Sequence, residues 1–282
     1  MLRREHTVLA PGFQALLRQH GLDTVESVFR LTAGDVITHS GSTEVRRVVL
    51  ASTEGARTLF IKKYWVSRPA QLWSGMFRGT FFGCPKVRRE FRNLELLRAA
   101  GLDAPPAAAF GEERHAGWLT RSFLISATVA DPMALNIFVR DGLPTLPKEE
   151  QRRVRRELIE NLARYTRRLH ERRFVHHDYF WRNILLSGRS LEHFFLIDAH
   201  KGRVWHRMGE NHARASDLAA LDAPAPHFFR RTERLRFYLR YRDRPRLTAD
   251  DKMLLRRTLG MAAPMRVKQL RRVMAAGPNP SR

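Results

Sequence analysis

Residues 174–186 of this chain read FVHHDYFWRNILL. Within this stretch Asn183 follows Asp178 by five positions, and apolar residues stand on both sides of the pair. A second apolar run, residues 194–197, ends at Asp198. In phosphoryl transfer one carboxylate orients a hydroxyl and accepts its proton, while an amide and a second carboxylate hold magnesium on the nucleotide phosphates. The spacing therefore predicts a catalytic base at Asp178 and magnesium ligands at Asn183 and Asp198.

The elements expected around this motif favour the same interpretation. Apolar residues at steps of three and four predict an amphipathic helix over residues 154–169, shortly before the motif. A short strand leads into the motif, and a hairpin that turns at Ser187-Gly188 leads to Asp198. Helix, strand, loop and hairpin follow one another in this order in the catalytic segment of kinases. An isolated Asp and Asn at this spacing would carry little weight, and an incidental polar loop is the alternative.

A kinase also needs a cation on the nucleotide phosphates, and residues 59–64, LFIKKY, offer two. Because side chains alternate along a strand, only one of Lys62 and Lys63 can face the nucleotide. The order Phe-Ile-Lys is similar to the Val-Ala-Ile-Lys pattern of kinases, which favours Lys62 and keeps Lys63 as the alternative. In kinases this lysine pairs with a glutamate of the following helix. Glu90 flanks the apolar stripe of that helix and is the predicted partner, whereas Glu95 lies further toward solvent.

The phosphate-binding loop is the least defined part of the predicted site. No Gly-x-Gly-x-x-Gly pattern occurs near the N-terminal strands. The segment Ser40-Gly41-Ser42-Thr43 could form a turn whose amides and hydroxyls contact phosphate. It could equally be an ordinary hairpin turn. The sequence leaves both interpretations open.

The N-terminal half of the chain is predicted to be rich in strands. Residues 34–63 and 118–129 have the composition of strands, with one helix expected at about 85–100. Two short helices are expected within residues 11–30. Asp23 with Glu26 three positions later predicts a capping box at the start of the second helix.

The second half of the chain is predicted to be mostly helical, and the change falls near residue 130. We therefore expect an α+β, two-lobed, protein-kinase-like fold. Residues 1–130 would form an N-terminal, nucleotide-binding lobe with two leading helices. Residues 131–282 would form a helical C-terminal lobe that carries the catalytic loop and a basic tail.

The charge of the chain is strongly positive. Lys and Arg total 51 against 28 Asp and Glu, which gives a net charge of +23. Such an excess attracts polyanions, whether nucleic acid, anionic lipid head groups or phosphorylated sugars. Cys84 is the single cysteine, which favours a reducing compartment, and we expect a cytoplasmic protein. No apolar run approaches the roughly 20 residues of a membrane-spanning helix.

Residues 65–83 have an odd composition for a surface connection. Two Trp, several Phe and a Met alternate with Arg, and Trp73 and Phe77 lie in this stretch. Bulky aromatic side chains beside cations suit a membrane interface. The hypothesis is that this segment touches lipid, and the alternative is that its aromatic residues pack on the N-terminal lobe.

With these motifs in place, the chain resembles the bacterial lipopolysaccharide core kinase family, the Kdo and heptose kinases. The resemblance covers roughly residues 30–245. It rests on five groups of residues: Phe60-Ile61-Lys62, the run from Phe81 to Glu90, Arg88-Arg89-Glu90-Phe91 with Asn93-Leu94 and Leu97 before Gly101, His176-His177-Asp178 with Asn183-Ile184-Leu185, and Leu196-Ile197-Asp198 with His200. Asp217 matches the aspartate that supports the catalytic loop in that family. Asp198-Ala199-His200 replaces the Asp-Phe-Gly of ordinary protein kinases, as in these relatives.

The resemblance implies a function that the residues alone do not give. It implies Mg²⁺ and ATP as cofactor and donor, with Lys62, Glu90, Asn183 and Asp198 on the nucleotide side and Asp178 as the base. The acceptor would be a sugar hydroxyl, on heptose or Kdo, of the lipopolysaccharide inner core. The enzyme would act as a peripheral protein on the cytoplasmic face of the inner membrane, on an anionic glycolipid.

Two other functions compete with this one. The first is a kinase for another acceptor, either a small amino sugar or a protein Ser or Thr. The net charge of +23 disfavours a cationic acceptor. The second is a non-catalytic, polyanion-binding protein on a kinase scaffold. The presence of Asp178, Asn183 and Asp198 disfavours that alternative, and a nucleic-acid partner is not expected.

Overall fold

The computed structural model describes residues 3–52, 55–66, 81, 83–188, 190–205 and 210–275. The chain divides into two compact units. Unit 1 comprises residues 1–96 and 105–128, and unit 2 comprises residues 97–104 and 129–282. The short segment Leu97–Ala104 therefore packs with the later part of the chain, although it precedes the last strands of unit 1.

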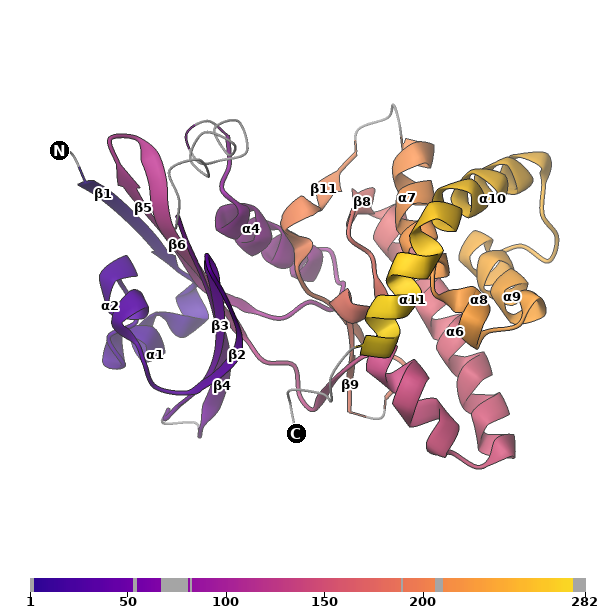
Figure 1. Ribbon diagram of the computed structural model, residues 1–282, viewed down its shortest axis with the longest axis horizontal. Helices are drawn as coiled ribbons and strands as arrows, with labels where there is room; N and C mark the ends of the chain where they lie inside the picture. The colour runs from indigo at the N-terminus through magenta and orange to yellow at the C-terminus, as the bar shows by residue number, and fades with distance from the viewer. Residues whose placement is uncertain are drawn as a thin grey trace. The chain divides into compact units, whose positions relative to one another are not determined.

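Unit 1 is built on an antiparallel sheet in the order β1-β5-β6-β4-β3-β2 (Figure 1). The strands are β1 Arg3–Leu9, β2 Asp35–Ser40, β3 Thr43–Leu50, β4 Arg57–Trp65, β5 Ala107–His115 and β6 Trp118–Ala127. Ser40 pairs with Thr43, so the segment between β2 and β3 is a hairpin turn. The strand-rich composition predicted for this half of the chain is confirmed. β1 and β5 lie outside the ranges predicted as strands.

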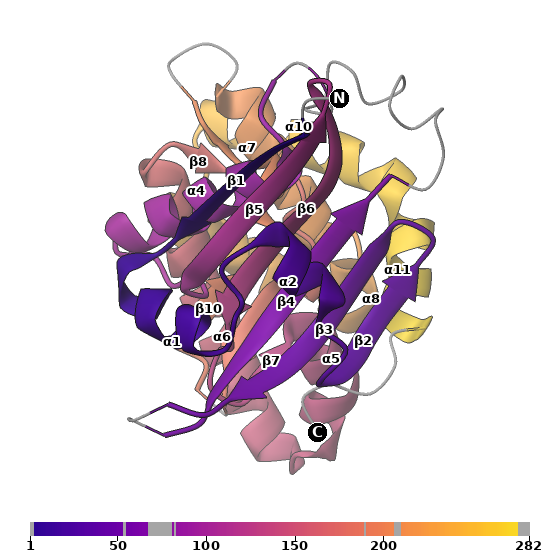
Figure 2. The same ribbon diagram turned by 90° about the vertical axis from the view of Figure 1, so that its left-hand side faces the viewer.

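The two faces of this sheet pack against different helices. Leu59 and Ile61 of β4 are fully buried in a cluster with residues of α1 Gln14–Gln19 and α2 Val25–Arg30. Figure 2 shows α1 and α2 in front of the sheet. Tyr64 belongs to a second cluster, with residues of β5, β6 and α4 Lys86–Ala99. Because side chains alternate along β4, Lys62 and Lys63 lie on opposite faces of the sheet.

The two helices expected within residues 11–30 are confirmed, but the predicted capping box was wrong by one residue. Thr24 is the N-cap of α2, and its hydroxyl accepts a hydrogen bond from the Ser27 amide at 3.1 Å. Glu26 instead makes ion pairs with Arg30 and Arg121. Asx and hydroxyl side chains both make good caps, and neighbouring candidates cannot be separated by sequence spacing alone.

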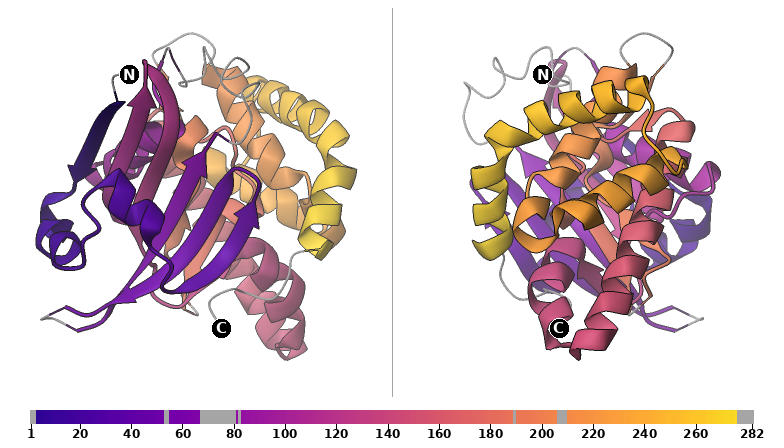
Figure 3. Two further views of the ribbon diagram at one scale, coloured as in Figure 1. Left: turned by 60° about the vertical axis from the view of Figure 1, so that its left-hand side comes forward. Right: turned by 90° about the vertical axis from the view of Figure 1, so that its right-hand side faces the viewer.

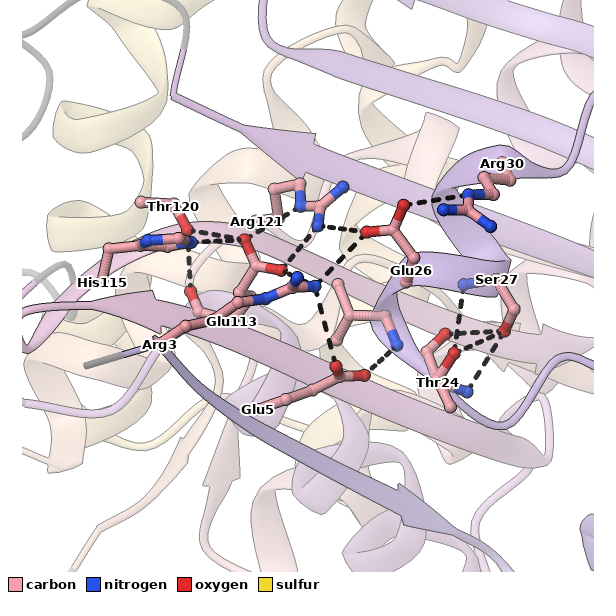
Figure 4. Close-up of polar contacts among 11 residues, drawn as sticks. Arg3, Glu5, Thr24, Glu26, Ser27, Arg30, Glu113, His115, Thr120 and Arg121 are labelled. Atoms are coloured by element: carbon pink, nitrogen blue, oxygen red, sulfur yellow. Dashed lines mark hydrogen bonds and ion pairs between the residues drawn. The ribbon is translucent and has the colours of Figure 1, made fainter. Parts of the chain in front are cut away.

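A network of ion pairs connects β1 and α2 to strands β5 and β6 (Figure 4). Arg121 contacts Glu113 at 2.6 Å and Glu26 at 2.7 Å, and Arg3 contacts Glu113 at 2.7 Å. Burial raises the pKa of Glu113, but the hydrogen bonds and charges of Arg121, His115 and Arg3 outweigh it and lower the pKa to about 2. A depressed pKa contributes stability above the ordinary value of 4.5 and loses it only as the pH falls toward 2. Glu113 therefore stays charged at neutral pH, and its ion pairs stabilise unit 1 there.

Unit 2 is mainly helical, with three short pieces of strand pairing. The helix predicted before the motif is confirmed as α6 Lys148–Glu171, in which Val154, Leu158, Leu162, Tyr165 and Leu169 are buried. α6 packs against α9 Arg231–Arg242, and α7 Glu210–Asp222 packs against α10 Ala249–Ala262. Figure 3, right, shows these helices, from pink α6 to yellow α11 Arg266–Ala275.

The remaining elements of unit 2 are short. They are β7 Pro132–Ala134, α5 Leu135–Ile137, the turns Phe138–Gly142 and Leu143–Thr145, β8 Phe174–Val175, the 3₁₀ turn Trp181–Asn183, β9 Ile184–Ser187, β10 Phe194–Leu196, the 3₁₀ turn Ala199–Lys201, β11 Arg203–Val204, α8 Ala225–Phe228 and the 3₁₀ turn Ala263–Met265. β9 and β10 form the hairpin expected between Asn183 and Asp198.

Candidate active site

The backbone before Asp178 is held by a buried carboxylate of α7. Asp217 is fully buried and accepts hydrogen bonds from the amides of His176 at 2.7 Å and His177 at 2.8 Å. His170 of α6 lies 3.4 Å from the same carboxylate. His177 has a left-handed φ of 59°, which a non-glycine residue adopts only where its surroundings hold it there. The supporting contact that the resemblance implied for Asp217 is present.

Asp178 and Asn183 are in direct contact. The Asn183 side-chain amide donates to the backbone oxygen of Asp178 at 2.8 Å and to its carboxylate at 3.2 Å. Asn183 is 2% exposed, and the 3₁₀ turn between the two residues makes this contact possible. The structure thus joins the two ends of the sequence motif in one site.

His176 and Asn183 together position the strand end that carries Asp198. The Ile197 amide donates to the Asn183 backbone oxygen at 3.1 Å, and His176 Nε2 contacts the Ile197 backbone oxygen at 3.0 Å. Burial lowers the pKa of His176, so the imidazole is neutral and its Nε2–H donates this bond. Asp198 follows with a left-handed φ of 57°. Both Asp178 and Asp198 act electrostatically on Arg182, so the two carboxylates share one neighbourhood.

The donor set suits a hard cation. The Asn183 amide nitrogen is used toward Asp178, which leaves its oxygen available to a cation, and Asp198 would add a carboxylate. Among the described residues no group of three or more His, Cys, Asp or Glu gathers into a metal site. Magnesium in kinase sites takes one or two protein carboxylates and completes its shell with phosphates and water. The residues present therefore fit magnesium bound together with a nucleotide.

In unit 1 the structure distinguishes the two candidate lysines. Lys62 Nζ lies 2.8 Å from Glu90 Oε1, and both side chains are largely buried. Lys63 lies on the other face, 3.0 Å from Glu44 and 3.0 Å from the Leu31 backbone oxygen. Glu95 is exposed. The structure therefore brings together the pair chosen from the sequence, while the contact of Lys62 with ATP stays a prediction.

Two cations next to Asp178 were missed by the sequence reasoning. Arg182 Nη2 lies 3.5 Å from one carboxylate oxygen, and Lys201 Nζ lies 3.5 Å from the other. Arg182 stands four positions after Asp178 within the motif, and Lys201 stands three positions after Asp198. Their positions within these two motifs could have revealed them, because Asp178 and Asp198 were already predicted to lie in one site.

A mainly apolar cavity of unit 2 lies apart from these residues. It has a volume of about 430 Å³ and is lined mainly by apolar side chains of α6, α7, α9 and α10, among them Leu158, Leu162, Leu218, Phe237 and Leu255. Trp181, inside the catalytic motif, also lines it, and its indole N–H donates to the Leu221 backbone oxygen at 2.8 Å. The cavity is a separate feature with the chemistry of an apolar ligand site.

The hypothesis of a lipid-contacting segment falls mostly outside the described part of the chain. Residues 67–80 and residue 82 are not described, and Trp73 and Phe77 are among them. Over the described ranges, no helix combines the length and the apolar character needed to span a bilayer.

Comparison with known proteins agrees with this geometry. Residues 32–238 match the model of the lipopolysaccharide kinase (Kdo/WaaP) family. A solved structure of WaaP in complex with acyl carrier protein is similar to this chain, with a TM-score of 0.64 and 26% identity. The match covers 95% of this chain and 99% of that one. No curated protein matches the chain.

The structural match confirms the predicted α+β, two-lobed, protein-kinase-like fold. The family match covers most of the chain and includes Lys62, Glu90, Asp178, Asn183 and Asp198. The chain therefore belongs to the Kdo/WaaP lipopolysaccharide kinase family, and it is a phosphotransferase that acts on a sugar hydroxyl.

Proposed function

We propose that this enzyme transfers the γ-phosphate of Mg-ATP to a heptose or Kdo hydroxyl of the lipopolysaccharide inner core. The observation that carries the proposal is the contact between Asn183 and Asp178, with Asp198 held nearby through Ile197. A base and two oxygen donors for magnesium are what phosphoryl transfer requires. The family membership supplies the class of acceptor.

In the proposed reaction the acceptor hydroxyl approaches the γ-phosphorus while Asp178 orients it. The new bond joins the sugar oxygen to phosphorus, the bond from phosphorus to the β,γ-bridging oxygen breaks, and the hydroxyl proton passes to Asp178. ADP leaves with the electron pair of the broken bond. Arg182 and Lys201, 3.5 Å from the Asp178 carboxylate, stabilise negative charge near the transferred group.

Magnesium, when bound, neutralises charge on the phosphates. Asn183 and Asp198 would hold it in unit 2. Lys62 would bind the α- and β-phosphates, and Glu90 would keep its side chain extended for that task. Transfer of labelled phosphate from ATP to purified lipopolysaccharide tests the proposal. Acceptors that end at Kdo or continue to heptose separate the two sugars.

The two neighbouring lysines provide a matched test of the nucleotide side. Lys62→Ala should lower kcat/KM for ATP by about a hundred-fold or more, because the lysine cation that binds the phosphates is lost. Lys63→Ala should instead lower the free energy of unfolding by about 1–3 kcal/mol, because Glu44 and the Leu31 carbonyl lose a partner. Kinetics and denaturant unfolding of both variants measure the two effects. Equal kinetic losses in both variants would contradict the assignment of Lys62.

We also propose acyl carrier protein as a partner of this chain. The similar WaaP structure contains that protein, and unit 2 here has an apolar cavity of about 430 Å³. A carried acyl chain would gain about 0.8 kcal/mol for each methylene buried there. Binding of acylated acyl carrier protein should therefore be more than ten-fold tighter than binding of the form without an acyl group. Equal affinity for the two forms, or no binding, in a titration by calorimetry would refute this use of the cavity.

Peripheral association with the membrane follows from the proposed acceptor. The net charge of +23 favours a surface of anionic lipid. The enzyme should float with liposomes that contain anionic lipid and be released as the salt concentration rises. Flotation that does not depend on anionic lipid would exclude an electrostatic attachment.

A further inference from the structure

A small hollow opens next to the catalytic base in unit 2. Its walls are formed by Phe180, Trp181 and Arg182 of the catalytic segment, by Asn136 of α5, and by Gln269 and Arg272 of α11. Its volume is about 20 Å³, which holds one water-sized group, such as the tip of a polar substituent, and not a sugar ring. The hollow therefore suits one group carried by a larger ligand.

The helix that closes this hollow is fixed in place. Arg140 Nη1 donates to the backbone oxygens of Val273 at 2.8 Å and Met274 at 3.2 Å, at the end of α11. The side chains of Gln269 and Val273 are buried on its inner face. Arg272, next to Val273, is thereby carried to the edge of the hollow.

Two guanidinium groups share this small space. Arg182 lies over the Phe180 ring at 4.6 Å and makes only long contacts, 3.4 Å to Gln269 and 3.5 Å to Asp178. Arg272 lines the same hollow, so its positive charge lies near that of Arg182. No described residue forms a hydrogen bond or ion pair with Arg272. An anion between the two guanidinium groups would relieve their repulsion and use their paired N–H donors.

Asn136, one of the residues lining the hollow, carries an independent sign of a ligand. Asn136 is 4% exposed, and its side-chain oxygen is buried without a hydrogen-bond partner among the described residues. A buried acceptor of this kind costs free energy until a donor reaches it. Arginines that need an acceptor, beside an amide oxygen that needs a donor, match a substituent bearing both an acidic group and a hydroxyl.

We propose that Arg182 and Arg272 bind an anionic substituent of the acceptor sugar, a carboxylate or a phosphate, and that the Asn136 oxygen accepts a hydrogen bond from a hydroxyl beside it. The inference rests on the proposed function, because it places this substituent beside the hydroxyl that Asp178 activates. The 3.5 Å contact between Arg182 and Asp178 sets the spacing, so the acidic group and the reacting hydroxyl belong to the same or adjacent sugars. Gln269 and Arg272 lie beyond residues 32–238, so the subsite adds to the part of the chain that the family model matches.

Neighbouring arginines on α11 allow a matched test. Arg272→Gln should raise KM for the lipopolysaccharide acceptor about ten-fold or more, with a smaller change in kcat, because a charge-assisted hydrogen bond is lost. Arg272→Lys keeps the charge and should recover part of this loss. Arg271→Gln removes the same charge from an adjacent position outside the hollow and should leave KM unchanged. Equal KM values for the Arg272→Gln and Arg271→Gln enzymes would overturn the subsite.

Modified acceptors identify the anion. The ten-fold penalty of Arg272→Gln should vanish on phosphatase-treated lipopolysaccharide if the anion is a phosphate, and on carboxyl-reduced lipopolysaccharide if it is a carboxylate. A penalty that persists on acceptor stripped of both groups would refute an anion subsite.

Binding without ATP separates this inference from the proposed function. The wild-type enzyme should bind delipidated core oligosaccharide in calorimetry, and Arg272→Gln should weaken that binding about ten-fold. Binding that depends on Arg272 without any phosphate transfer would leave the subsite standing and reject the function. Phosphate transfer that does not depend on Arg272 would support the proposed function and reject the subsite. Absence of both binding and transfer would reject both.

Discussion

Replacement of Asp178 by Asn should lower kcat for phosphate transfer by about 10²- to 10⁴-fold, the usual contribution of a positioned general base. The amide has nearly the same shape as the carboxylate, and its oxygen can still accept the 3.2 Å hydrogen bond from Asn183. It cannot take a proton from the acceptor hydroxyl. The loss should therefore appear in the chemical step, with the binding of ATP and the unfolding temperature close to those of the wild type. Steady-state kinetics with labelled ATP, nucleotide titration and thermal unfolding measure these three quantities.

A charge-matched control separates base catalysis from a change in net charge. Asp250 lies exposed in the first turn of α10, so Asp250→Asn removes one carboxylate remote from the motif. This variant should retain wild-type kinetics. If the Asp178→Asn enzyme kept more than a tenth of the wild-type kcat, Asp178 would not be the base.

Replacement of Asp217 by Ala should damage both stability and catalysis. The amides of His176 and His177 would lose their shared acceptor in a fully buried place. Each buried donor left without a partner costs about 1–3 kcal/mol, so the free energy of unfolding should fall by about 2–5 kcal/mol. The strained backbone at His177 would no longer be held, and Asp178 would lose its position. Denaturant unfolding and kcat at a temperature where the variant stays folded measure the two losses.

Two further variants make this prediction specific. Asp217→Asn keeps one side-chain acceptor and should fall between Asp217→Ala and the wild type. Asp222 lies at the end of the same helix and pairs with Arg234 at 2.7 Å in a partly exposed position. Asp222→Ala should cost about 1 kcal/mol or less and leave kcat unchanged. Equal effects of Asp217→Ala and Asp222→Ala on unfolding and on kcat would contradict the proposed support of the catalytic loop.

Local patterns in the sequence predicted much of the fold because they report local physics. The steps of three and four in α6 follow from one buried helix face, which the structure confirms. Alternation along β4 limited the choice to one lysine per face, and the structure places Lys62 with Glu90. The 3₁₀ turn Trp181–Asn183 ends the segment that begins at Asp178, and the side chains of Asp178 and Asn183 meet.

Other features could not be read from the sequence, because they depend on distant segments meeting. β1 is polar and largely exposed, and its strand conformation comes from pairing with β5 about a hundred residues later. Lys201 reaches Asp178 only through the β9–β10 hairpin. Arg272 lines the same hollow as Arg182 because α11, whose end is bound by Arg140, packs there. Charged side chains follow no sequence period that would have predicted these long-range contacts.

The most direct test of the central claim is mass spectrometry of lipopolysaccharide core from cells that carry the intact chain or the Asp178→Ala variant as their only copy. The proposed function predicts a core oligosaccharide that is one phosphate lighter in the variant, about 80 Da, with fragment ions that place the missing group on heptose or Kdo. Core phosphorylation that is identical in the two cells would contradict it.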